Sequence, residues 1–528
     1  MSRSAERAPD STAVTMAGNN LSYGALVERS NQIANVLVDR GVQRGDRVGL
    51  YAHKSIDVVA GLHAIMKAGA GYVPINPDAP AAYVEHIVRD CGIKHLVTGS
   101  SRRGVLAKLS DDLDVQTYLG LGPDDGFAER TVTWDEVASA STDEPTVEVG
   151  ETDLAYIIFT SGSTGVPKGI AHSHRSALAY SQASSTAFGF RPDDRITSHA
   201  PLNFDLSTLE LFAGALAGSA VVMIPESHAR LPASFSQLLQ DERVTIVNAV
   251  PFALVQLLHR GALDERDLSA IRWVLFGGEV YPTRDIRGLM DALPNAKFGN
   301  VYGPAEVNGC TYLVVPEIPP DQTEPISIGW LYPGMDAVVV DSEDNEVGPG
   351  VVGEMLVCSD AHMIGYWNQP ALTESSRLRR TGEDGSEKVF YRTGDLVERQ
   401  ADGSFRLLGR RDRQVQMRGH RVELDEVETA LISHAAVEQA VVYAVPDGDG
   451  SVQIEAVVTL FDRAEAEERE LSLHVAALLP KYALPRRLTI EPSVPRTSTG
   501  KADRVKLIEL ARQRAEALNT DLQGISHD

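Results

Sequence analysis

Residues 156–169 read Tyr-Ile-Ile-Phe-Thr-Ser-Gly-Ser-Thr-Gly-Val-Pro-Lys-Gly, and this stretch decides the fold prediction. An apolar run leads into a loop of glycines and hydroxyl side chains that ends at Lys168. Glycines let backbone N–H groups approach an anion closely, while hydroxyl groups and a lysine add donors and positive charge. The stretch therefore predicts a buried strand followed by a phosphate-binding loop. It is not a Walker A loop, because Pro167 stands where that motif needs glycine.

On both sides of this loop, short apolar runs alternate with helical periodicity. Buried strands are predicted at residues 47–51, 95–98, 220–224, 244–250 and 272–276. Helices are predicted at residues 26–37, 56–68 and 252–258, and Ser22 is suited to cap the first of them. Strands that alternate with helices are typical of an α/β fold with mainly parallel sheets.

The last quarter of the chain has a different pattern. A charge-dense segment at residues 409–421 is followed by predicted helices at 424–433, 465–479 and 503–516 and predicted strands at 438–444, 452–460 and 487–490. This pattern predicts a small α+β domain. With the boundary at Asp412, we expect a large N-terminal domain over residues 1–411 and a small C-terminal domain over residues 412–528.

Composition narrows the class of protein. The 528 residues carry 49 Lys+Arg and 73 Asp+Glu, a formal net charge of −24, which disfavours nucleic-acid and anionic membrane partners. The three cysteines, Cys91, Cys310 and Cys358, have neither zinc-site spacing nor a disulfide framework. No signal peptide and no apolar run of about 20 residues is visible. The sequence therefore predicts a cytoplasmic enzyme with no nucleic-acid or membrane partner.

Three further segments carry residues that suit nucleotide chemistry. They are residues 300–306 (Asn-Val-Tyr-Gly-Pro-Ala-Glu), 391–395 (Tyr-Arg-Thr-Gly-Asp) and 495–504 (Pro-Arg-Thr-Ser-Thr-Gly-Lys-Ala-Asp-Arg). An aromatic side chain can stack on a base, and the Glu306 carboxylate can hold Mg²⁺. Asp395, placed after a glycine turn, can accept hydrogen bonds from both ribose hydroxyls. Taken singly, each segment is also typical of an ordinary turn or a solvated lysine.

Together and in this order, the four segments resemble the adenylate-forming superfamily, which includes the amino-acid adenylation domains of nonribosomal peptide synthesis, acyl- and aryl-CoA ligases, and luciferases. Residues 21–23, 67–74 and 409–423 resemble further signatures of that superfamily, so the resemblance covers nearly the whole chain. It implies ATP and Mg²⁺ as cofactors, formation of an acyl adenylate, and transfer of the acyl group to a thiol. It also implies that residues 1–411 hold the ATP and acid sites and that the small domain is mobile.

The resemblance implies roles residue by residue. The residues expected to bind the nucleotide are Thr160, Ser161, Gly162, Ser163, Thr164, Gly165, Lys168, Gly278, Asn300, Tyr302, Gly303, Asp395 and Arg410. Glu306 is expected to bind Mg²⁺, and Lys501 to bridge the substrate carboxylate and the α-phosphate. These cations would offset the repulsion between a carboxylate and an anionic phosphate. Asp412 is the expected hinge, and Gly419 is expected to line the route of a phosphopantetheine thiol.

Residues 202–212 favour an amino acid as the substrate. Asp205 aligns with the aspartate that holds the substrate ammonium in amino-acid activators, a role for which a carboxylate is suited. The same alignment predicts a substrate site made of Phe204, Asp205, Leu206, Leu209, Asn248, Leu275, Gly277, Val301, Gly309 and Cys310. Apart from Asp205 these positions carry no charge, so we expect an apolar side chain or an aliphatic ring. An α-amino, an imino and a β-amino acid all remain open.

Two alternatives, and departures from the superfamily pattern at Asn76, Ala305 and Gln416, accompany this hypothesis. An acyl- or aryl-CoA ligase of the same fold is the main alternative, although it has no reason to place a charge at Asp205. A non-catalytic nucleotide-binding relative is another, and the presence of Glu306, Asp395 and Lys501 argues against it. Ala305 stands where the superfamily usually has a threonine beside the α-phosphate. Because the sequence carries no carrier motif after Lys501, we expect a discrete ligase that loads a separate carrier protein.

Overall fold

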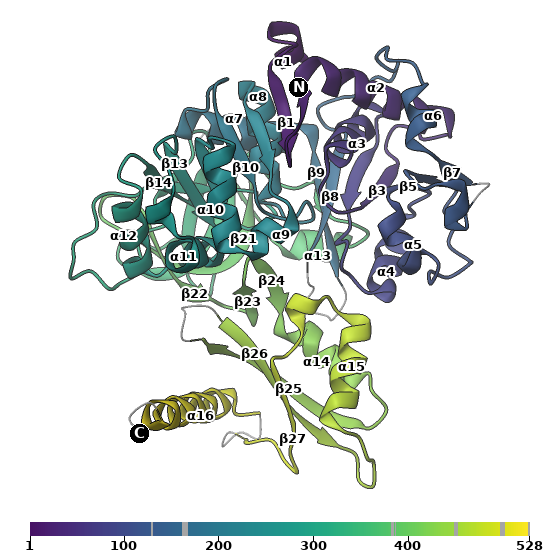
Figure 1. The fold of residues 1–528 in the computed structure, drawn as a ribbon. Coiled ribbons are helices and arrows are strands. Elements are labelled where there is room, and N and C mark those ends of the chain that lie inside the picture. Colours follow the sequence, from purple (N-terminus) through teal and green to yellow (C-terminus); the bar gives the residue numbers. More distant parts are fainter. Residues whose placement is uncertain are drawn as a thin grey trace. The chain divides into compact units, whose positions relative to one another are not determined.

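The computed structural model describes residues 1–127, 130–160, 167–381, 385, 387–447, 452–496 and 502–525, with side chains up to residue 514. The chain forms two compact units, each with its own core (Figure 1). The first unit contains the described parts of residues 1–77, 84–159 and 169–412. The second contains the described parts of residues 78–83, 160–168 and 413–528. The division of roles between residues 1–411 and 412–528 stays a prediction.

The largest sheet of the first unit has a parallel centre, as the α/β pattern predicts. In the described chain its strand order is β16-β15-β14-β13-β12-β10-β11-β1-β2, with parallel pairing from β14 through to β1. The strands are β1 (Thr12–Met16), β2 (Asn19–Ser22), β10 (Arg195–Ser198), β11 (Ala220–Met223), β12 (Ile246–Ala249), β13 (Trp273–Gly277), β14 (Lys297–Tyr302), β15 (Thr311–Val314) and β16 (Trp330–Leu331).

A second, mainly parallel sheet has the order β19-β9-β8-β4-β3-β5-β6-β7 among the described residues. Its strands are β3 (Arg47–Tyr51), β4 (Gly71–Pro74), β5 (His95–Thr98), β6 (Thr117–Leu119), β7 (Thr131–Val132), β8 (Leu154–Thr160), β9 (Lys168–Ser173) and β19 (Gly365–Tyr366). The third sheet is antiparallel and contains β17 (Asp336–Val340), β18 (Val352–Cys358), β20 (Arg377–Thr381), β21 (Glu387–Arg399) and β22 (Phe405–Arg410).

Helices alternate with the strands of these sheets along the chain. They are α1 (Ser2–Arg7), α2 (Tyr23–Asp39), α3 (Ile56–Lys67), α4 (Ala81–Cys91), α5 (Arg103–Leu106), α6 (Trp134–Ala138), α7 (His174–Phe188), α8 (Gly214–Ala217), α9 (Glu226–Arg230), α10 (Pro232–Asp241), α11 (Pro251–Arg260), α12 (Thr283–Ala292), α13 (Pro370–Ser375) and the π-helical turn η4 (Leu209–Ala213). Every described helix is too short or too polar to span a lipid bilayer.

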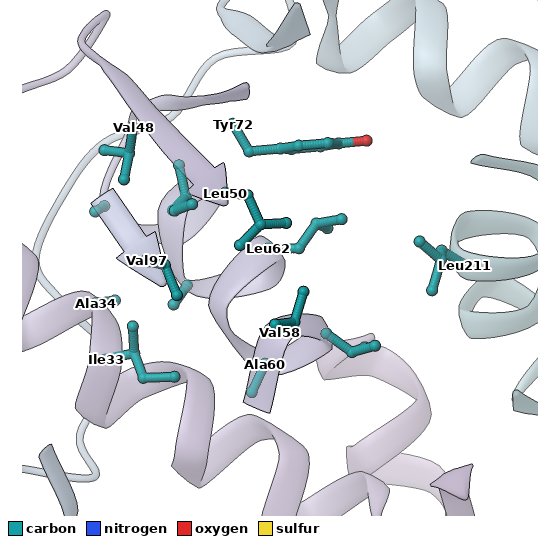
Figure 2. Packing of buried hydrophobic residues seen from close by; sticks show 14 of the residues in the cluster. Ile33, Ala34, Val48, Leu50, Val58, Ala60, Leu62, Tyr72, Val97 and Leu211 are labelled. Carbon is teal, nitrogen blue, oxygen red and sulfur yellow. The ribbon is translucent and has the colours of Figure 1, made fainter. Parts of the chain in front are cut away.

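The core between α2, α3 and the second sheet shows why these segments fold as expected. The Ser22 side chain caps α2 by accepting a hydrogen bond from the Ala25 backbone, as predicted. The buried residues Leu26, Ile33 and Leu37 recur at helical spacing on α2. Ile33 belongs to the same buried cluster as Leu62 of α3 and Val97 of β5 (Figure 2). Amphipathic helices thus bury one apolar stripe on the sheet, which accounts for most of their stability.

The second unit is a small α+β body, which confirms the predicted change of fold class. It contains β23 (Gln414–Met417), β24 (His420–Glu423), α14 (Leu424–Ile432), β25 (Val437–Pro446), β26 (Val452–Leu460), α15 (Glu468–Leu478), β27 (Arg487–Ile490) and α16 (Arg504–Ile525). Alternate residues of β25 face opposite sides, as strand geometry requires. Ala440 and Val442 pack with α14 and α15, whereas Val441 and Tyr443 pack with Leu507 of α16.

Two local predictions were wrong. Residues 391–395 do not form a turn, because they lie inside the long strand β21, where the pairing register with β18 shifts and creates a bulge. Lys168 is not part of a loop, because it is the first residue of strand β9. In both cases pairing with neighbouring strands overrides the local tendency of glycine and proline to form turns.

Candidate functional site

The carboxyl ends of β12, β13 and β14 bring predicted substrate-site residues to one face of the largest sheet. Asn248 pairs in register with Leu275, and Gly277 pairs with Val301. Because residues two apart on a strand share a face, all four positions lie on the same side. Ligands of open α/β sheets bind beyond the carboxyl ends of the strands. The topology therefore groups these four positions where a ligand is expected.

An apolar cluster covers this face. Leu209 from η4, Leu275 and Val301 pack together with Tyr180 and Phe188 of α7. The exposed fractions of Leu209, Leu275 and Val301 are 1%, 0% and 7%. Leu206 precedes η4 and is half-buried. The surroundings of these positions are thus apolar and aromatic, in agreement with the character that the sequence predicts.

Gly309 and Cys310 lie beside the same cluster. A Cβ at Gly309 would lie 2.5 Å from the Tyr180 ring, so only glycine lets this ring pack against the backbone. Cys310 is fully buried, and its Sγ lies 3.5 Å from the backbone oxygen of Tyr302. Burial raises the pKa of the Cys310 thiol, so this side chain is a neutral, weakly polar group.

Asp205 lies half-buried in the turn before η4. Its backbone oxygen accepts hydrogen bonds from the Thr208 backbone nitrogen at 2.9 Å and hydroxyl at 2.7 Å. Burial is the main reason that the pKa values of Tyr156 and Tyr180 are raised, and the Asp205 carboxylate raises both further. The Asp205 carboxylate is therefore close enough to act on Tyr180, the ring that packs against Gly309.

Three predicted nucleotide-site residues and the predicted hinge residue meet in one hydrogen-bonded chain. The Tyr302 hydroxyl donates to Asp395 Oδ2 at 2.5 Å, and Arg410 Nη1 donates to Asp395 Oδ1 at 2.6 Å. The same guanidinium group donates twice to Asp412, at 2.7 Å each. Burial, and then the Asp395 charge, raises the pKa of Tyr302 well above its usual value, so the phenol remains a donor.

A bulge in β21 aims Asp395 at these partners. Gly394 has φ +72°, and a Cβ there would lie 2.9 Å from Arg410 Nη2. The Thr393 hydroxyl accepts from the Asp395 backbone nitrogen at 3.0 Å and donates to the Met355 backbone oxygen at 2.7 Å. Bulges commonly redirect a side chain next to a functional site. Here the bulge explains why a glycine precedes the aspartate.

Other predicted nucleotide-site residues lie near the ends of β13 and β14. Asn300 occupies the opposite face of the sheet from Val301, and its Nδ2 donates to the Ser327 backbone oxygen at 3.1 Å. A Cβ at Gly303 would lie 2.2 Å from a backbone oxygen. Gly278 has φ +90°, and a Cβ there would lie 3.8 Å from the Phe204 ring. The predicted nucleotide and substrate sets therefore adjoin at Gly278 and Phe204.

Glu306 is fully buried and has a partner that sequence reasoning missed. The Tyr366 hydroxyl donates to Glu306 Oε1 at 2.8 Å and lies 3.2 Å from the Tyr391 hydroxyl. No local signal marks Tyr366, because it belongs to the distant strand β19. Mg²⁺ usually takes one or two carboxylates together with phosphate and water oxygens, so a single buried carboxylate fits this ion. The described residues contain no cluster of three or more His, Cys, Asp or Glu side chains suited to a metal.

The predicted phosphate-binding loop is described only at its ends. Thr160 ends β8, and its Oγ1 is buried without a hydrogen bond to any described residue, whereas Lys168 is 9% exposed. Gly419, in the turn between β23 and β24, has φ +82°. The predicted residues Ser161, Gly162, Ser163, Thr164, Gly165 and Lys501 lie outside the described residues.

Comparison with known proteins gives matches along nearly the whole chain. The family model described as AMP-binding enzyme matches residues 1–367, and that of the AMP-binding enzyme C-terminal domain matches residues 426–501. An L-proline--[L-prolyl-carrier protein] ligase of Pseudomonas fluorescens is 33% identical over 513 residues, which cover 97% of this chain and 98% of that protein.

Two further matches differ in length and in kind. Tyrocidine synthase 3 of Brevibacillus parabrevis is 31% identical over 507 residues, which cover 95% of this chain but 7% of the synthase. Among solved structures, the amide bond synthetase McbA from Marinactinospora thermotolerans matches with a TM-score of 0.84 and 26% identity, covering 96% of this chain and 99% of that one.

Proposed function

Because the chain belongs to the AMP-binding enzyme family, we propose that the site described above activates an amino acid with ATP and loads it onto a carrier protein. The protein is an amino-acid adenylating ligase. The observation that carries the assignment of the site is the meeting of Tyr302, Asp395 and Arg410 in one hydrogen-bonded chain. An oriented carboxylate of this kind is suited to hold the two hydroxyls of a ribose.

The first half-reaction joins two anionic groups. A carboxylate oxygen of the amino acid attacks the α-phosphorus of ATP, the bond to the β-phosphate oxygen breaks, and pyrophosphate leaves. We assign the charge compensation to Lys501 and to a Mg²⁺ ion held by Glu306. The ion, when bound, neutralises the phosphate charge that grows in the transition state. Thr160 and Lys168 are proposed to contact the departing phosphates.

The second half-reaction transfers the acyl group. The phosphopantetheine sulfur of the carrier attacks the carbonyl carbon, the bond to the AMP oxygen breaks, and a thioester forms while the thiol proton is released. We propose that Asp412 acts as a hinge between the two half-reactions and that Gly419 lines the thiol route. Conformational steps of this type control many two-stage enzymes.

The proposed substrate is a small amino acid with an apolar side chain or an aliphatic ring. Support comes from Leu209, Leu275 and Val301, which pack in one apolar cluster, and from Asp205 beside it. The ammonium group would pair with Asp205, while the side chain lies against the cluster. L-proline, the amino acid in the name of the Pseudomonas relative, fits this description.

Cysteine chemistry supports a cytoplasmic location, which we propose here. Cys91, Cys310 and Cys358 are free thiols, and two of them are buried. Disulfides are rare where cellular thiols stay reduced. A free-thiol protein is therefore suited to a reducing compartment.

The test is amino-acid-dependent exchange of pyrophosphate into ATP, measured over a panel that includes L-proline, other small α-amino acids and β-amino acids. At least one amino acid should support exchange. Replacing Asp205 by alanine should raise the KM for that amino acid about tenfold to a hundredfold, because a buried charge pair is lost. Exchange driven only by plain carboxylic acids, and unaffected in D205A, would instead identify an acyl- or aryl-CoA ligase.

A further inference from the structure

A buried glutamic acid lies next to the predicted substrate site but has no assigned role. Glu210, on the π-helical turn η4, has an exposed fraction of 0%. Its Oε2 accepts a hydrogen bond from Asn248 Nδ2 at 2.5 Å. Asn248 itself is 1% exposed and shares its sheet face with Leu275. The Glu210 carboxyl group thus forms a hydrogen bond with Asn248, the polar side chain that the sequence analysis places in the substrate site.

The same carboxyl group also interacts with a serine. Glu210 Oε1 and Ser198 Oγ are both buried, and the interaction of the Ser198 side chain with Glu210 opposes the rise in the pKa of that glutamic acid. Ile196 and Ile246 pair across β10 and β12, so Ser198 lies alongside Asn248, on the same face. A polar patch thus borders the apolar cluster at the strand ends.

Two titratable groups face Glu210. Lys54 donates to the backbone oxygens of Ser198 at 2.9 Å and His199 at 3.0 Å, and its charge acts on Glu210. The Tyr180 phenol is influenced by the Glu210 charge. Burial raises the pKa of Glu210 to about 8, although Asn248 and then Lys54 oppose this rise, and burial lowers the pKa of Lys54 to about 8. Near neutral pH the glutamic acid therefore keeps its proton.

The position of Asn248 depends on this contact. An asparagine side chain on a strand can adopt several rotamers and can present either its oxygen or its nitrogen to a ligand. The short hydrogen bond to Glu210 selects one rotamer and one orientation. A preorganised polar group loses less entropy on binding than one that must be ordered by the ligand.

We propose that Glu210 is a positioning residue of the amino-acid site: by holding the amide of Asn248, it sets the affinity for the amino acid without affecting that for ATP. This inference rests on the proposed function, because it takes Asn248 to contact the amino acid. Glu210 acts through Asn248 and does not itself touch the reacting atoms.

The decisive experiment compares Glu210→Leu and Glu210→Gln with the wild-type protein in pyrophosphate exchange. E210L should raise the KM for the amino acid about tenfold to a hundredfold, because a hydrogen bond to a buried partner is lost, and leave the KM for ATP within about threefold. E210Q should keep a near-normal KM at pH 7, since glutamine resembles the protonated acid. Glu226→Gln is the matched control, because Glu226 also acts on Lys54 but pairs with His53 and Arg230.

A double-mutant cycle separates positioning from a merely structural role. If Glu210 acts through Asn248, adding E210L or E210Q to Asn248→Ala should raise the amino-acid KM no further than N248A alone. Because Asn248 donates to Glu210, loss of the Glu210 proton between pH 7 and pH 9 should strengthen this hydrogen bond, so the wild-type KM should change over this range in a way that the KM of E210Q does not. The pH profile keeps the test decisive if E210L does not fold. Additive effects, equal changes in the KM for ATP, or identical pH profiles would overturn the inference.

The outcomes also distinguish this inference from the proposed function. If the wild-type protein exchanges with an amino acid while the E210L and E210Q kinetics equal its own, the function stands and the role of Glu210 is wrong. If no amino acid supports exchange but a plain acid does, the proposed substrate is wrong. The same variants assayed with that acid then decide whether Glu210 still positions Asn248 for it.

Discussion

The two sides of the site are built differently. On the proposed nucleotide side, Tyr302 and Arg410 both donate to Asp395, so both of its carboxylate oxygens accept hydrogen bonds. On the proposed amino-acid side, an apolar cluster is bordered by a few polar side chains, namely Asp205, Ser198, Asn248 and Glu210. One side is an ionic network, whereas the other is an apolar surface with a small number of polar groups.

This difference matches what each side is proposed to recognise. ATP is the same for every member of the family, so its site can be fixed by charge-assisted hydrogen bonds with defined geometry. Amino acids differ in their side chains, and apolar packing discriminates among them by size at about 1–3 kcal/mol per methylene group. Mutations on the nucleotide side should therefore change the KM for ATP, and those on the other side the KM for the amino acid.

The largest effect is expected at Lys501. Replacing Lys501 by alanine should lower the rate of adenylation about 10²–10³-fold, the usual effect of losing one preorganised donor to a developing negative charge. The measurement is the maximal rate of pyrophosphate exchange at saturating ATP and amino acid. Lys506→Ala, which removes an exposed lysine of the adjoining helix, serves as the control and should have little effect. Near-normal exchange by K501A would refute the catalytic role.

The next largest effect is expected at Asp395. The substitution Asp395→Asn removes the charge that Tyr302 and Arg410 hold, so the KM for ATP should rise about tenfold to a hundredfold. The KM for the amino acid should stay within about threefold of the wild-type value. Asp402→Asn, at an exposed turn, is the matched control. An equal rise in both KM values would show that the two sides are not separable.

A smaller effect is expected at Tyr302. Tyr302→Phe keeps the ring but removes the hydroxyl that donates to Asp395. One hydrogen bond of this kind contributes about 0.5–1.5 kcal/mol, so the KM for ATP should rise about threefold to tenfold. Steady-state kinetics with varied ATP provides the measurement. A larger loss than in D395N would contradict the assignment of Asp395 as the main ribose contact.

The smallest effect is expected in the pH dependence of stability. The pKa of Glu210 is raised from 4.5 to about 8 in the folded protein, so the folded state keeps a proton that the unfolded state loses as pH rises. This contribution to stability is complete below about pH 4.5 and is lost as pH rises towards 8. The melting temperature of E210Q, relative to wild type, should therefore increase by about 2–4 °C from pH 5 to pH 8. A constant difference would place the pKa of Glu210 near its usual value.

Sequence patterns predicted much of this architecture because they report local physics. The strand predicted at residues 438–444 lies within β25, the helical spacing in α2 follows from which face is buried, and Ser22 caps its helix as expected. The bulge at Gly394 could not be predicted, because it depends on how β21 pairs with β18. The partners of Glu306 and Asn248 were missed for a similar reason, since Tyr366 and Glu210 carry no local signal.

The sequence by itself predicted the fold class and many of the elements in their order, and it supplied candidate residues for binding phosphate, ribose and an ammonium group. Propensity, periodicity and motif spacing are properties of neighbouring residues, so they can be read along the chain. Only the tertiary structure decided that Arg410 joins Asp395 to Asp412 and that Glu210 holds Asn248. These contacts depend on strand register and on the packing of η4 against the sheet, which are fixed only when distant segments bury their apolar surfaces together.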